Sequence, residues 1–242
     1  MRHLLGYCRP DDHDPRDHLF AAAEAPVPEP PAVDLSDKLP APWDQGNLGS
    51  CTGHGSAGAI AFLHQGFMPS RLQLYGQGRQ LEGTFTQDAG AMIRDVVKQA
   101  AKLGVAPETD WPYVVSKFAR AWPAKATADG AKHLISTYER VTALDGFYQA
   151  LARGFPVIVG LTLYQSFESD AVAQSGVVPM PQKGEQPLGG HCVLVVGYDK
   201  AAGTFKVRNS WGTGWGDGGH FHLPAAYLAS PKLTSDCWVV KA

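Results

Sequence analysis

Three residue types in this chain could together carry out nucleophilic chemistry. Cys51 lies in the glycine-rich stretch QGNLGSCTGHGSAGAI, just before an apolar segment that favours a helix. A thiol at a turn into a helix can be acidified by backbone N–H groups and by the helix dipole. Such a thiol needs a base to take its proton, and the base needs a third group that orients its ring.

The histidines differ in sequence context, and one of them suits the role of the base. His191 stands in GGHCVLVVGYD, directly after two glycines and at the start of a strongly apolar strand. His54 follows Cys51 by one helical turn, which is a poor geometry for accepting the thiol proton. We expect His54 and His64 to be structural.

The third group is expected to be an Asn or Asp with a fixed side chain. The stretch VRNSWGTGWGDGG offers Asn209 just after a predicted strand, with Trp211 and Trp215 close behind. A neutral Asn can accept the imidazole N–H, and a flanking indole could shield that hydrogen bond from water.

The elements that must position these residues change in type along the chain. Helical spacing and glycine stops predict helices over 57–67, 88–103 and 144–153, with Gly104 as a C-cap. Short β-branched runs predict strands over 155–163, 191–199, 203–211 and 219–224. Helices first and strands second predict an α+β fold with two layers or lobes.

Composition excludes several other classes of protein. The chain has 242 residues, a net charge of −2 and no apolar run near the 18–20 residues that span a bilayer. We therefore expect no nucleic-acid or membrane partner. We also expect a monomer. No ordinary signal peptide is visible, which fits either a cytoplasmic protein or one exported by another route.

The four cysteines do not form a metal-binding pattern. There is no C-x-x-C pair, so we expect no zinc or iron–sulfur site. Nucleophilic chemistry at a cysteine needs only a reduced thiol, so we expect no metal and no other cofactor. One disulfide among Cys8, Cys192 and Cys237 is left open by the sequence. Cys192 itself is expected to be a packing residue.

Three motifs in this order resemble the papain-like cysteine proteases, from about Leu39 to the C-terminus. They are Gln45 six residues before Cys51, Gly190-His191 opening a Val-rich strand, and Asn209-Ser210-Trp211-Gly212 followed by GWG. The resemblance implies a helical lobe that carries the cysteine, a β-barrel-like lobe that carries the histidine, and a cleft between them. On this basis the chain divides into an N-terminal extension (1–38), a helical lobe (39–130) and a β-rich lobe (131–242).

The resemblance also implies a cysteine endopeptidase that acts on peptide or protein substrates. Cys51 would be a thiolate paired with protonated His191, and it would form an acyl-enzyme that water hydrolyses. Gln45 and the Cys51 backbone N–H would form the oxyanion hole. Asn209 would hold the histidine ring, and Trp211 would cover that contact.

The sequence departs from the family pattern at three places. Thr52 stands where an aromatic residue is usual, and Leu48 replaces a disulfide-bonded cysteine, which fits a bacterial-type member. Only about forty residues precede the catalytic motif. We hypothesise that 1–31 forms a strap over the cleft as an autoinhibitor; the alternative is a structural strap on the far face.

The resemblance implies a substrate-binding set by approximate alignment. Apolar residues at 92 and 93 predict a medium-sized apolar side chain, such as Leu or Val, two residues before the cleaved bond. If Asp236 pointed inward, a basic residue would be accepted too, and the alternative for 92 and 93 is plain helix core. The implied residues are Gly90, Ala91, Met92, Ile93, Gly190 and Ser235.

Two other functions stay open on the sequence alone. An acyltransferase or transpeptidase could use the same acyl-enzyme with an amine in place of water. A catalytically silent binding module on the same fold is the other alternative, although such a protein would typically lack the cysteine or the histidine.

Overall fold

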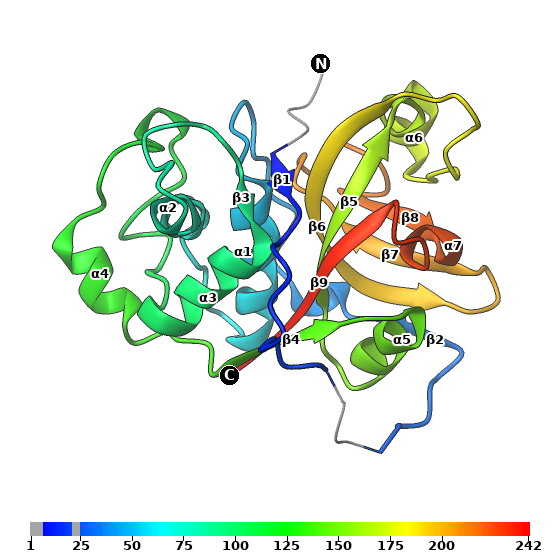
Figure 1. The fold of residues 1–242 in the computed structure, drawn as a ribbon, viewed down its shortest axis with the longest axis horizontal. Coiled ribbons are helices and arrows are strands. Elements are labelled where there is room, and N and C mark those ends of the chain that lie inside the picture. The colour runs from blue at the N-terminus through cyan, green and yellow to red at the C-terminus, as the bar shows by residue number, and fades with distance from the viewer. Residues whose placement is uncertain (1–6, 21–24) are drawn as a thin grey trace.

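The fold consists of two lobes that lie side by side. The computed structural model describes residues 7–20 and 25–242, and Figure 1 shows helices on one side and a twisted sheet on the other. The strand β1 (Cys8–Arg9) lies between the lobes, next to β3 (Ala91–Met92) and β6 (Pro187–Asp199). The predicted two-lobe α+β class is confirmed.

The helices divide between the two lobes. None of those in the described part of the chain is long and apolar enough to cross a membrane. The helical lobe holds α1 (Cys51–Leu63), α2 (Arg71–Leu81), α3 (Ile93–Leu103) and α4 (Ala124–Gly130), and the β lobe holds α5 (Leu144–Ala152), α6 (Asp170–Ser175) and α7 (Ala225–Leu228). Short 3₁₀ turns occur at η1 (Ser36–Lys38), η2 (Val115–Lys117) and η3 (Gln165–Glu168).

The described strands of the β lobe form one antiparallel sheet. Its order is β4-β9-β5-β6-β7-β8, and β2 (Ala32–Asp34) pairs with the far end of β6. The remaining bounds are β4 (Thr137–Val141), β5 (Val157–Tyr164), β7 (Thr204–Arg208), β8 (His220–Pro224) and β9 (Thr234–Lys241). β1 and β3 pair separately and run parallel.

The central strands are buried on both faces. Side chains alternate along a strand, so every second residue faces the same way. In β6, Val193 and Val195 belong to the core of the β lobe, whereas Leu194 and Val196 pack against the helices. Strands β5 and β9 alternate in the same manner. One face of the sheet therefore packs in the core of the β lobe, and the other face packs against the helices of the helical lobe.

The glycines of α1 let this face of the sheet come close. A Cβ on Gly55 would lie 2.8 Å from the Cys192 sulfur, and a Cβ on Gly58 would lie 3.0 Å from Leu194 Cδ2. A Cβ on Gly53 would lie 2.5 Å from a carbonyl oxygen of α2. Three glycines in one helix therefore reflect close packing of the backbone.

The predicted elements differ from the structure mainly at their ends. The helix expected over 57–67 begins six residues earlier, at Cys51, and ends at Leu63. The helix expected over 88–103 is confirmed from Ile93, and Gly104 ends it with a φ of 71°. The sequence analysis missed α2, whose apolar residues are interrupted by polar ones that are buried here, and it missed β4.

A buried arginine fixes the loop that leads into β3. Arg79, on α2, is fully buried and donates hydrogen bonds to the carbonyls of Phe85 (2.6 Å), Gln87 (2.9 Å) and Phe118 (2.7 Å). Its guanidinium also lies 4.0 Å from the centre of the Tyr75 ring. Burial disfavours the charged form and lowers the pKa of Arg79. The hydrogen bonds to these carbonyls and the contact with the aromatic ring stabilise the positive charge.

We expect Arg79→Met to lower the free energy of unfolding by about 3 kcal/mol or more, because three buried carbonyls lose their donor. Denaturant unfolding followed by circular dichroism would measure the loss. Arg120→Met, at an exposed position, should change the stability by less than about 0.5 kcal/mol. Equal stabilities of the two variants would contradict this role of Arg79.

Candidate active site

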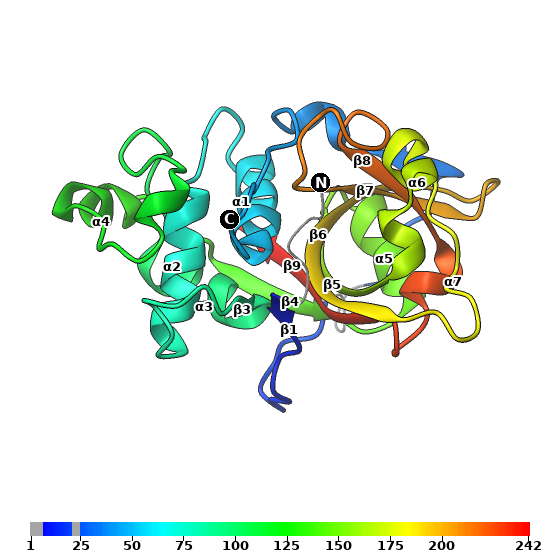
Figure 2. The ribbon, with the colours of Figure 1, turned by 90° about the horizontal axis from the view of Figure 1, so that it is seen from above.

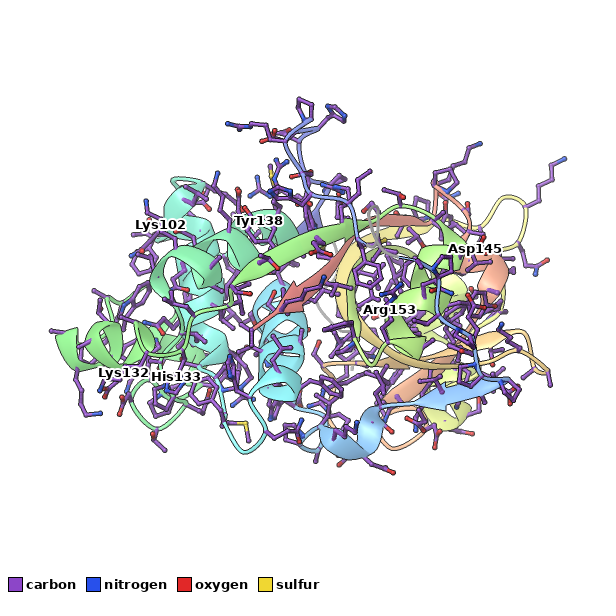
Figure 3. The ribbon with its side chains drawn as sticks, turned by 90° about the horizontal axis from the view of Figure 1, so that it is seen from below. Lys102, Lys132, His133, Tyr138, Asp145 and Arg153 are labelled. Carbon is purple, nitrogen blue, oxygen red and sulfur yellow. The ribbon has the colours of Figure 1, made fainter. Side chains whose placement is uncertain are left out.

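Cys51 is the first residue of α1 and faces β6. Figure 2 shows α1 lying alongside β6, at the boundary between the lobes. The backbone N–H groups of Cys192, Thr52 and Cys51 itself are close enough to the Cys51 sulfur to act against the rise of its pKa. Because Cys192 directly follows His191, this contact brings the predicted nucleophile and the predicted base to the same point.

His191 is oriented by Asn209, as the sequence predicted. His191 lies on β6, and Asn209 follows the end of the neighbouring strand β7. The His191 Nε2 atom and the Asn209 Oδ1 atom are 2.8 Å apart, and the amide oxygen can only accept, so Nε2–H is the donor. Asn209 Oδ1 also accepts from the Ser210 N–H at 2.8 Å. The ring therefore has a fixed orientation.

Trp211 stacks on the histidine ring. The two ring centroids are 5.1 Å apart with an interplanar angle of 30°. Trp211 in turn packs edge-on against Phe167 of η3 (5.5 Å) and Trp215 (4.9 Å). His191 is fully buried under this aromatic cluster. The indole thus shields the bond between His191 and Asn209 from water.

Gln45 is buried and held at both ends of its amide. Its Nε2 donates to the Leu48 carbonyl at 2.9 Å, and its Oε1 accepts from the Ser210 hydroxyl at 2.6 Å. Ser210 stands next to Asn209, so the Gln45 loop and the Asn209 loop are tied directly together. The sequence analysis quoted Ser210 as part of a motif but gave it no role.

His54 is not part of the hydrogen-bonded set. Its Nδ1 donates to the Ser50 carbonyl at 3.0 Å, and its ring packs against Tyr113. Burial, followed by the charge of Arg71, lowers the pKa of His54 to about 3. The histidine is therefore neutral near pH 7, in line with the structural role expected for it.

The N-terminal segment crosses the site. β1 pairs in register with β3, so that Cys8 lies opposite Ala91 and the Ala91 N–H donates to the Tyr7 carbonyl at 3.1 Å. A Cβ on Gly90, whose φ is +69°, would overlap that same carbonyl oxygen. On the other side, a Cβ on Gly190 would overlap the Cys8 carbonyl oxygen.

Cys51 has almost no solvent contact, and Tyr7 of the N-terminal segment lies close to the residues that precede it. The residue is 1% exposed, and a Cβ on Gly49, two positions before it, would overlap the Tyr7 ring. Burial, with a smaller contribution from Cys8, raises the pKa of the Cys51 thiol, whereas the three N–H groups act in the opposite direction.

Of the remaining residues of the predicted substrate set, Ser235 lies near Cys8, whereas Met92 and Ile93 do not. The Cys8 sulfur is 3.4 Å, and Ser235 Oγ 3.0 Å, from the position of a Cβ on Gly160. Met92 is partly exposed opposite Arg9, whereas Ile93 is fully buried in the core of the helical lobe.

A charged cluster anchors the segment after it leaves the cleft. Asp11 accepts from the Trp238 indole at 2.8 Å, from the Arg94 N–H at 3.1 Å and from Arg140 at 3.3 Å. Arg140 also pairs with Asp17 and Asp236. Burial, with the neighbouring Asp236 adding to it, raises the pKa of Asp11 to about 7.

Two further residues near the site were missed by the sequence analysis. Asp88 accepts from the Gly49 N–H at 3.1 Å and from the Tyr75 hydroxyl, which in turn accepts from the Gly90 N–H. The side chain of Glu82 forms an ion pair with Arg9 and accepts from the Met92 N–H at 2.7 Å. No local pattern marks either residue, because their partners are distant in sequence.

Comparisons with known proteins agree on one family. Residues 30–236 match the family of papain family cysteine proteases. An uncharacterised peptidase C1-like protein of Acanthamoeba polyphaga mimivirus is 38% identical over 213 residues, which cover 82% of this chain and 68% of the relative. Cathepsin L 1 of Paramecium tetraurelia is 27% identical over 199 residues, and the match spans only 59% of its length.

A solved structure covers the whole chain. Xylellain, a cysteine protease from Xylella fastidiosa, superposes with a TM-score of 0.90 at 33% identity, covering 100% of this chain and 99% of that one. A digestive procathepsin L 3 from Tenebrio molitor shares the fold, with a TM-score of 0.76 at 17% identity.

We expect His54 to make the protein less stable in acid. Its pKa is about 3 in the fold and near 6.5 when unfolded, so the unfolded chain binds more protons between these values, and stability decreases as the pH is lowered through that window. His54→Asn, which keeps a donor toward Ser50, should remove up to about 1.4 kcal/mol of this loss per pH unit. Urea unfolding at several pH values measures it.

The matched control is His13→Asn, at an exposed position in the N-terminal segment. Its unfolding free energy should follow the wild-type pH profile. A His54→Asn profile as steep as the wild type would contradict the assignment.

Proposed function

Because this chain belongs to the papain family of cysteine proteases, we propose that it is an endopeptidase that uses Cys51 as nucleophile and is restrained by its own N-terminal segment. The single observation that carries the catalytic part is the 2.8 Å bond between His191 and Asn209 beside the Cys51 sulfur. Peptide bonds of peptides or proteins are the substrates that this family hydrolyses.

The reaction proceeds through a thioester. The Cys51 thiolate attacks the peptide carbonyl, and protonated His191 gives its proton to the leaving amine. The neutral imidazole then takes a proton from water, which attacks the acyl-enzyme and releases the acid. Asn209 and Trp211 act by keeping the ring in place through both proton transfers.

Gln45 is the oxyanion donor in this proposal. Its amide nitrogen carries two hydrogens, and one of them is used on the Leu48 carbonyl. The second hydrogen and the Cys51 backbone N–H would stabilise the charge on the carbonyl oxygen. The bond from Ser210 to Gln45 Oε1 keeps the amide from turning over.

Restraint follows from what residues 7–9 contact. They pair with Ala91 and Met92, lie against Gly90 and Gly190, and cover Cys51. These are residues that the family resemblance assigns to substrate. A peptide substrate therefore needs the place that Tyr7, Cys8 and Arg9 now fill. When these residues leave, the Cys51 thiol becomes exposed to solvent, which lowers its pKa and favours the thiolate.

The proposed side-chain pocket favours apolar residues. Cys8, a small apolar side chain, lies beside Gly160 and Ser235, and Leu or Val of a substrate would take this place after it leaves. Asp236 is paired with Arg140 at 3.3 Å. With its charge already neutralised, it offers little attraction to a basic side chain.

The test is hydrolysis of fluorogenic peptides together with labelling by a thiol-reactive epoxide. Cleavage and labelling that both vanish in Cys51→Ala would support the proposal. Labelling without any cleavage, in intact and truncated protein alike, would favour acyl transfer. If the truncated protein shows neither cleavage nor labelling, the proposed peptidase function is wrong.

Deletion of residues 1–10 should raise peptide hydrolysis by about tenfold or more. In the intact chain only the fraction of molecules with an open site can bind substrate, and the deletion raises this fraction. This truncation removes the residues in the cleft but keeps Asp11 and its buried partners. The alkylation rate of Cys51 by iodoacetamide should rise in parallel. Arg16→Ala, which alters only an exposed ion pair with Asp14, is the control.

Unchanged hydrolysis and alkylation after the deletion would remove the restraint from the proposal and leave the peptidase intact. Arg9→Ala should lie between wild type and truncation, since it loses only the ion pair with Glu82.

In the truncated protein, Gln45→Ala should lower kcat about 10²–10³-fold with little change in KM, because the lost donor acts on the charged intermediate. Ser210→Ala should lower kcat less, since it only positions Gln45. Gln65→Ala, an exposed glutamine at the end of α1, is the control and should match the parent. A rise in KM alone would contradict the oxyanion role.

A further inference from the structure

We propose that Cys8 and Cys192 form a disulfide under oxidising conditions and so fasten residues 7–9 in the cleft above Cys51. The effect of this bond on activity rests on the proposed function, whereas the bond itself does not. All four cysteines are free thiols in the structure, and each is buried.

The sheet register brings the two cysteines together. Gly160 on β5 pairs directly with Cys192 on β6, and the Cβ positions of such a pair lie about 5 Å apart on the same face. The Cys8 sulfur lies 3.4 Å from the Cβ position of Gly160. Cys8 and Cys192 therefore occupy the same small region of one sheet face.

The two sulfurs already interact. The Cys192 thiol is close enough to raise the pKa of the Cys8 thiol, and Cys8 acts on the pKa of Cys192 in turn. The Cys8 sulfur also lies beside the Gly160–Cys192 pair of the sheet, so we assign Cys192 as the disulfide partner of Cys8.

Three glycines make room for the pair. A side chain at Gly160 would contact the Cys8 sulfur, and a Cβ on Gly190 would lie 3.5 Å from the Cys8 Cβ. A Cβ on Gly55 would lie 2.8 Å from the Cys192 sulfur. Because these three residues have no side chains, none of them obstructs the two thiols. A change of the cysteine rotamers can then bring the sulfurs to bonding distance.

The bond can form by exchange with a small disulfide such as glutathione disulfide. The Cys8 thiolate attacks one sulfur of the reagent, forms a mixed disulfide and releases one glutathione thiol. The Cys192 thiolate then attacks the Cys8 sulfur and releases the second. Two protein thiols are oxidised and one small disulfide is reduced to two thiols, so the electrons balance.

The bond would act as a covalent latch on the strap. In an oxidising compartment the cleft stays filled, and Cys51 is protected from the oxidant by the residues above it. In a reducing compartment the Cys8–Cys192 bond is broken by thiols, and the restraint depends only on non-covalent contacts. The Cys192 side chain, followed by burial, raises the pKa of the Cys8 thiol, which slows exchange while the segment is seated.

The first test is chemical and needs no enzyme activity. The full-length Cys51→Ser chain is equilibrated in glutathione buffers from reduced to oxidised, its free thiols are alkylated, and the digest is mapped by mass spectrometry. The expected product is a Cys8 peptide linked to a Cys192 peptide, present also in Cys237→Ser and lost in Cys192→Ala. Separate alkylation of Cys8 and Cys192, or a mixed glutathione adduct alone, would overturn the proposal.

The second test follows peptide hydrolysis by the otherwise native chain. Oxidation should lower the wild-type rate at least about tenfold, and dithiothreitol should restore it. Cys8→Ser keeps Cys51 and should lose much less, which separates the latch from oxidation of the nucleophile. The latch would be overturned if oxidation lowered the hydrolysis rate equally in the wild type and in Cys8→Ser. A Cys8–Cys51 disulfide in the wild type would overturn it too. A mapped disulfide in a chain that cleaves nothing would refute only the proposed function.

Discussion

The site depends on strands that are buried on both faces. Strands β5, β6 and β9 send alternate side chains into two different cores, so neither lobe can move without disturbing the other. Within β6 this alternation sends Val193 into the β-lobe core while Leu194 faces α1. The glycines of α1 allow the helix to approach this face of the sheet, which is why the first residue of the helix meets a strand of the opposite lobe.

The candidate catalytic residues could be proposed from the sequence because their signals are local. Cys51 stands at a turn before a helix, His191 opens a strand, and Asn209 follows one, so each residue could be found from its immediate neighbours. The resemblance to the papain family joined them across more than a hundred residues. The 2.8 Å bond between His191 and Asn209 then depends on strand register, which puts β7 next to β6.

The supporting contacts could not be predicted because they join distant segments. Asp88 meets Gly49, Ser210 meets Gln45, and Asp11 meets Trp238, and none of these pairs shares a motif. Helix α2 escaped detection because its buried face includes Gln73, Gln77 and Arg79, whose polar groups bond to backbone partners. Composition alone cannot distinguish such residues from exposed ones.

The segment in the cleft belongs to the same chain as the cleft. Residues 7–9 are joined to Asp11, which bonds to Trp238, Arg94 and Arg140, so in the proposed restraint their local concentration at the site is on the order of millimolar or higher. This value does not change when the protein is diluted, and one molecule cannot fill the site of another more readily than its own. If the proposed restraint holds, each copy carries one occupant in fixed proportion, and a competing peptide must exceed that local concentration, weighted by relative affinity, to enter.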